Sequence, residues 1–101
     1  MFTKLTDRRG VRNSDGFTVA RTGSPITQFV IHYEECDGHS VDYPLENLMP
    51  GTHNVIRVGK IRRWKPPFEI EPIKHEKRLQ IARRIVDGMN EIGDELDISE
   101  Q

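Results

Sequence analysis

Five carboxylates lie within the thirteen residues from Glu34 to Glu46, close enough together to serve one purpose. Carboxylates can bind a metal ion, carry out acid–base catalysis or attract a basic protein. The plainest interpretation is solvated charge on a turn and an edge strand. The more specific interpretation is an acidic patch for a basic protein partner. On that interpretation the partner-binding residues are Glu34, Glu35, Asp37, Asp42 and Glu46.

Other groupings with chemical potential are weaker. His32, Cys36 and His39 have a spacing that could supply three zinc ligands. The dipeptide Asp37-Gly38 already explains that segment as a turn, and no fourth ligand is implied. The chain also has no glycine-rich phosphate loop and no Gly-x-Ser-x-Gly turn. We therefore expect no metal, no cofactor and no enzymatic activity.

A run of basic residues surrounds Trp64, the only tryptophan of the chain. A cationic strand with an exposed ring could stack a nucleobase and follow a phosphate backbone. Successive strand residues point to opposite faces, however, so these charges share one surface only if a bulge intervenes. A small nucleic-acid-binding or regulatory domain is therefore the runner-up function. The basic residues are Arg57, Lys60, Arg62, Arg63 and Lys65.

The length and composition indicate one domain in the cytoplasm. A chain of 101 residues has the size of one domain with one core. A formal net charge of -1 gives no general reason to expect nucleic acid or a membrane surface, and no stretch approaches the ~18 apolar residues of a membrane span. The single cysteine, Cys36, forms no internal disulfide, and MFTKLTDRRG does not resemble a signal peptide. A homodimer remains an open alternative.

Both ends of the chain are expected to be loosely held. Residues 1–12 show little hydrophobic pattern, and the sequence leaves open whether residues 1–24 join a sheet. From Asp87 to Gln101 there are six carboxylates and no basic residue. Residues 94–101 are therefore expected to form an acidic frayed tail.

Period-two alternation predicts strands in the first half of the chain. A turn at 13–16 precedes a short strand at 17–21, and a longer strand follows in ITQFVIHYEE. Asp37-Gly38 then predicts a hairpin, whose return strand carries alternating apolar residues over 41–45. Pro44 lacks a backbone N–H group, so it should lie at an edge or an end of that strand.

A third long strand is expected over residues 53–64. The apolar phase changes within it, which predicts a bulge at or near Gly59. Pro66 and Pro67 then end the strand, because neither can donate a ladder hydrogen bond. The ring of Trp64 is expected to cover the resulting corner.

The pattern changes to a helical period in the last third of the chain. An amphipathic helix is predicted over residues 74–92, with Gly93 as its C-terminal cap. Arg78 falls at the centre of its apolar arc, with His75 inside the arc. Arg78 is therefore expected either to extend past the sheet edge into solvent or to pair with Glu71, Glu69 or Glu46, with a functional anion contact as the minor alternative. The predicted fold class is α+β: an antiparallel sheet of four to five strands with one C-terminal amphipathic helix packed on one face.

The helix and the segment before it carry a recognisable pattern, W-x-P-P followed by P-I-x-x-x-x-R-x-x-I. Here it consists of Trp64, Pro66, Pro67, Pro72, Ile73, Arg78 and Ile81. It resembles the C-terminal half of small immunity proteins of bacterial polymorphic toxin systems, over roughly Ile26 to Gly93. Lys74 stands where that group would have a capping Ser or Thr.

The resemblance implies a cytoplasmic single-domain protein with an antiparallel sheet and one helix. It also implies that the protein has no catalytic activity and neutralises one cognate toxin domain by direct binding and occlusion. An oligomer-forming module and the nucleic-acid-binding domain remain the alternatives.

Overall fold

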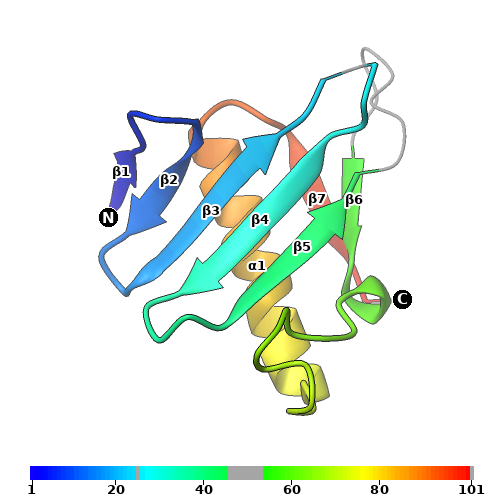
Figure 1. Ribbon diagram of the computed structural model, residues 1–101. Helices are drawn as coiled ribbons and strands as arrows, with labels where there is room; N and C mark the ends of the chain where they lie inside the picture. Colours follow the sequence, from blue (N-terminus) through cyan, green and yellow to red (C-terminus); the bar gives the residue numbers. More distant parts are fainter. Residues whose placement is uncertain (25, 46–53, 101) are drawn as a thin grey trace.

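The computed structural model describes residues 1–24, 26–45 and 54–100. Five strands form one antiparallel sheet in the order β1-β2-β3-β4-β5, and helix α1 lies across one face of it (Figure 1). The predicted α+β class is confirmed. The sheet strands are β1 (Phe2–Lys4), β2 (Arg9–Asn13), β3 (Phe17–Thr22), β4 (Val30–Glu35) and β5 (Ser40–Pro44), and the helix α1 is His75–Glu91.

The predicted hairpins form because their turns contain glycine in the left-handed region. Gly16 has a φ of 100° between β2 and β3, and Gly38 has a φ of 95° between β4 and β5. Register places Ile31 opposite Tyr43 and Tyr33 opposite Val41, and all four side chains are buried. Pro44 is the last residue of β5, which is an edge strand of the sheet, as predicted.

The first dozen residues are part of the sheet, which corrects the expectation of a loose start. Val11 of β2 is buried, and α1 contacts this strand. Gly10 permits close pairing with β3, since a Cβ atom there would lie 2.4 Å from the carbonyl oxygen of Val19. Phe2 also packs against the core, on the ring of Phe17, so apolar contacts hold a segment whose composition looks like a loop.

The expected third strand over 53–64 was wrong in length, and the strand that forms lies outside the five-stranded sheet. Strand β6 covers only Asn54–Arg57, and a 3-10 turn over Val58–Lys60 follows in place of a bulge. Val58 and Ile61 are both buried, and the N–H group of Ile61 donates to the carbonyl of Val58 at 3.1 Å. A spacing of three residues suits a 3-10 turn, which explains the change of apolar phase. His53 lies outside the described residues.

The acidic C-terminal segment is also ordered, contrary to the expected frayed tail. Strand β7 (Leu96–Ser99) pairs in parallel with β6, and Leu96 is buried. Asp94 lies 2.9 Å from the guanidinium of Arg21 and 3.1 Å from that of Arg9. The segment is therefore held by pairing with β6, by the apolar side chains of Leu96 and Ile98, and by arginines from the main sheet.

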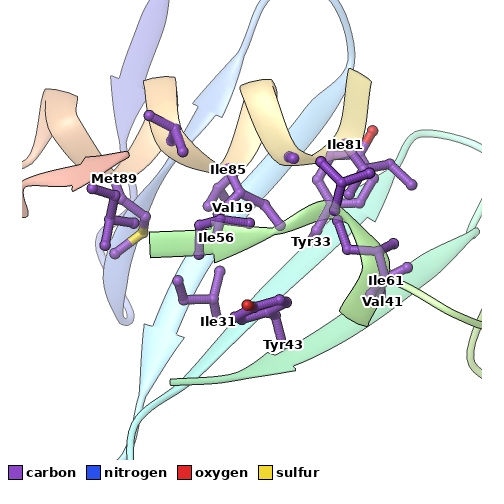
Figure 2. Close-up of a cluster of buried hydrophobic side chains, with 14 of the residues drawn as sticks. Val19, Ile31, Tyr33, Val41, Tyr43, Ile56, Ile61, Ile81, Ile85 and Met89 are labelled. Carbon is purple, nitrogen blue, oxygen red and sulfur yellow. The ribbon is translucent and has the colours of Figure 1, made fainter. Parts of the chain in front are cut away.

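Helix α1 follows its predicted bounds closely. Its end is a Schellman motif: Gly93, with a φ of 92°, donates to the carbonyl of Asn90, and Asp94 donates to the carbonyl of Met89. Ile81, Ile85 and Met89 face the strand side chains (Figure 2). The core that they share includes Val19, Ile31, Tyr33, Val41, Tyr43, Ile56 and Ile61.

Arg78 does not form the predicted ion pair with Glu71 or Glu69. Its side chain is half-buried, and its Nε donates to the carbonyl oxygen of Ile73 at 3.0 Å. Glu46, the third predicted partner, lies outside the described residues. His75 is exposed rather than packed, because the first buried residue of the helix is Ile81. The contact of α1 with the core begins at Leu79, one turn after His75.

Candidate functional site

The five predicted acidic residues do not form one patch. Glu34 is exposed, and cross-strand pairs with Thr18 and Ser40 place it on the face of the sheet away from α1, here called the outer face. Figure 1 views the sheet from this face. Asp42 also lies on the outer face, and Asp37 lies at the tip of the β4–β5 hairpin. Glu46 is outside the described residues, and Glu35 points the other way.

Glu35 is an internal anchor for the helix. The hydroxyl of Tyr33 donates to its Oε2 at 2.6 Å, and Arg84 and Lys77 of α1 both pair with the same oxygen. Burial and the hydrogen bond to Glu35 raise the pKa of Tyr33 above its ordinary range. Only 14% of the Glu35 side chain is exposed. The structure thus uses this carboxylate to hold α1 to the sheet.

The outer face carries a hydrogen-bonded row of four side chains, Thr22, His32, Asp42 and Lys65. Thr22 Oγ1 lies 2.7 Å from His32 Nε2, and His32 Nδ1 lies 2.7 Å from Asp42 Oδ1. The second carboxylate oxygen of Asp42 lies 3.1 Å from Lys65 Nζ. Burial opposes ionisation of Asp42, but the bonds from His32 and Lys65 outweigh it and hold its pKa below the ordinary value.

The order hydroxyl, imidazole, carboxylate is the one that serine hydrolases use. Here the row lies on an open sheet surface, partly exposed to water, where charge stabilisation is weak. In a hydrolase-like mechanism Asp42 would stabilise the protonated ring of His32, but here Asp42 also pairs with Lys65. A hollow of about 180 Å³ next to the row has both acidic and basic walls, including Glu34 and Arg8. We interpret the row as an ordered polar surface.

This row was not among the predicted sites, although one signal for it is present in the sequence. His32 and Asp42 stand at equal distances from the hairpin turn at Asp37, so a symmetric hairpin must pair them. Thr22 and Lys65 come from other segments, and their approach depends on the tertiary fold.

One predicted motif residue, Trp64, contacts His39, which lies in a clamp between the hairpin tip and the segment after Trp64. The His39 ring stacks on Phe68, with centroids 3.7 Å apart, and meets the edge of Trp64 at 4.8 Å. Its Nδ1 lies 2.9 Å from Asp37, and its Nε2 lies 3.0 Å from Glu71. Of the motif residues, Trp64, Ile73 and Ile81 are buried, Arg78 is half-buried, and Pro66, Pro67 and Pro72 are exposed.

Two carboxylates control the charge of His39. Asp37 raises the pKa of the imidazole above its ordinary value, partial desolvation of the ring opposes this, and Glu71 adds to the increase. In return, the backbone N–H and the ring of His39 lower the pKa of Asp37. The hairpin tip and the segment after Trp64 are joined by the contact between His39 and Glu71.

Trp64 is not available to stack a nucleobase, since only 6% of it is exposed. The five basic residues from Arg57 to Lys65 are all exposed. They are not restricted to alternate faces, because the chain turns through Val58–Lys60. The basic residues that could contact phosphates are exposed, but the tryptophan ring that would stack a base is buried.

Within residues 1–24, 26–45 and 54–100, no three His, Cys, Asp or Glu side chains gather as a metal site would require. His32 belongs to the outer face and His39 to its clamp, while Cys36 is exposed between them. No helix in the described part of the chain has the length and apolar character needed to cross a membrane. Comparison with protein-family models, curated proteins and solved structures gave no match for this chain.

Proposed function

We propose that this protein is an immunity protein, which binds one cognate toxin domain and blocks it without catalysis. The proposal starts from the resemblance of the Trp64–Ile81 segment to such proteins. The observation that carries it is the ordered surface made by the outer face and the hairpin tip. Side chains that are already held by hydrogen bonds lose little entropy when a partner binds, so such a surface suits tight occlusion.

The charge of this surface favours a basic partner. Glu34 is exposed and has no ion-pair partner among the described residues, and Asp37 is exposed at the hairpin tip. A toxin that cuts nucleic acid has a basic active site, which these carboxylates would attract at long range. In this proposal the protein acts in the cytoplasm of the toxin-producing cell, and it needs no cofactor.

Nucleic-acid binding is the second candidate, and the exposed basic residues over 57–65 favour it. The burial of Trp64 weighs against it, because that ring was to provide the stacking surface. Retention on heparin or DNA that is lost with added salt would support this alternative.

Co-expression tests the proposal. A toxin gene is expected immediately upstream, as the variable C-terminal domain of a large secreted protein. Cells that express this toxin domain should survive only when the present chain is co-expressed, and the two proteins should co-purify. Toxin that kills despite abundant folded chain would contradict the proposal. The absence of such a gene would also contradict it.

A further inference from the structure

Ile70 is exposed to solvent, although the segment that carries it, between Trp64 and α1, is held by hydrogen bonds and a ring contact. Its exposed fraction is 92%. The N–H group of Phe68 donates to the carbonyl of Lys65, and the N–H group of Glu71 donates to the carbonyl of Phe68, each at 3.0 Å. Ile70 therefore lies within the second of two successive turns. Single exposed apolar residues are common on protein surfaces, so exposure alone does not indicate a binding site, and the residues around Ile70 must be considered.

The segment is attached to the sheet on both sides of Ile70. Before it, the ring of Phe68 stacks on His39, and the N–H group of Lys65 donates to the carbonyl of Ser40 at 2.9 Å. After it, the carboxylate of Glu71 contacts His39 Nε2 at 3.0 Å. Prolines at 66, 67 and 72 restrict the backbone further. Because the segment is already ordered, it would lose little conformational entropy when a partner binds. A residue on such a segment is suited to be an anchor in a protein–protein contact.

Carboxylates flank Ile70 in the chain. Glu69 and Glu71 are its chain neighbours, and both are exposed. Asp37 is brought to the same end of the molecule through its contact with His39. From Pro66 to Glu76 the chain has three carboxylates and one lysine, Lys74. An apolar centre with a charged rim is the usual anatomy of a protein–protein contact.

We propose that Ile70 is the apolar anchor of the toxin contact and enters a pocket rimmed by lysine or arginine side chains. This inference rests on the proposed function and adds the residue and the partner chemistry to it. It shifts the centre of the contact from the middle of the outer face to the end where the hairpin tip meets the segment after Trp64.

Ile26 provides a matched control. It is 95% exposed and also lies in a hydrogen-bonded turn, between Ser24 and Thr27. Its neighbours are uncharged, and the β3–β4 connection that carries it lies at the opposite end of the sheet from the segment before α1 (Figure 1). Substitution of either isoleucine removes the same exposed side chain without opening the core.

The experiment measures the dissociation constant of the purified upstream toxin domain for the full chain and its variants. Ile70→Ala should weaken binding by at least about tenfold, whereas Ile26→Ala should change it by less than about twofold. Both variants should melt at the wild-type temperature. Glu69→Gln should weaken binding more at low salt than at high salt.

Two negative results have different meanings. If the wild-type chain binds but Ile70→Ala binds equally well, the anchor assignment is wrong and the proposed function stands. If the wild-type chain does not bind the toxin domain, the proposed function is wrong and the anchor assignment fails with it. A loss of affinity that is equal for Ile70→Ala and Ile26→Ala would also overturn the assignment.

Discussion

The imidazole of His39 stacks on the ring of Phe68, with centroids 3.7 Å apart and planes inclined by 18°. One residue comes from the β4–β5 hairpin and the other from the segment between Trp64 and α1. Their contact joins the two parts of the chain that carry the candidate partner surface. It also gives Trp64 and Phe68 a structural role, because both rings contact His39.

The clamp should make stability depend on pH. The pKa of His39 is raised in the folded chain above its ordinary value of about 6.5, so folding favours the protonated ring. This contribution is complete below about pH 6.5 and is lost as the pH rises through the folded-state pKa. The wild-type protein should therefore melt at a higher temperature than His39→Gln, and the difference between the two melting temperatures should be larger at about pH 5.5 than at about pH 8.5. An equal difference at both pH values would show that the ring charge is irrelevant.

Trp64 is predicted to be a core residue. Trp64→Ala should reduce the free energy of unfolding by about 3–5 kcal/mol, because it removes a buried indole and leaves a cavity. Urea unfolding measures the change, with the exposed Arg62→Ala as the control at about 0.5 kcal/mol or less. Unchanged stability together with a loss of binding would instead make Trp64 a contact residue.

Adjacent glutamates should behave differently. Glu35→Ala removes the acceptor of the Tyr33 hydroxyl and the carboxylate that pairs with Lys77 and Arg84, so it should cost about 1–3 kcal/mol of unfolding free energy. Glu34→Ala, one residue earlier on the outer face, should cost about 0.5 kcal/mol or less. Chemical denaturation of both variants checks this contrast, and similar values for the two would argue against an internal role for Glu35.

The C-terminal strand should contribute to stability. Leu96 is buried between β6 and the end of α1, and Leu96→Ala should cost about 2–5 kcal/mol. Glu100→Ala, at an exposed position four residues later, should have little effect. If both variants unfold like wild type, residues 94–101 are a frayed tail as their composition suggested.

Local sequence signals predicted those parts of the fold that local chemistry determines. Asp37-Gly38 marked the hairpin, alternation from Ile31 to Tyr33 marked its buried face, and Gly93 marked the end of the helix. In each case the deciding interaction lies within a few residues of the signal.

The remaining features depend on contacts between distant segments. The β6–β7 pair joins Ile56 to Ile98, and no local pattern announces a parallel partner forty-two residues away. Charge counting grouped Glu34 with Glu35, but alternation along β4 sends them to opposite faces. Sequence analysis singled out Trp64 and His39 separately, and only the tertiary fold brings them together.

Inhibition of the toxin by the purified chain tests the central claim most directly. Increasing amounts of the chain are added to a fixed amount of the upstream toxin domain, and the remaining toxin activity is measured. The account predicts that activity disappears near one equivalent, and that Glu34→Lys needs more protein, with a smaller effect of salt on its inhibition. Toxin that stays fully active in the presence of excess folded chain would contradict it.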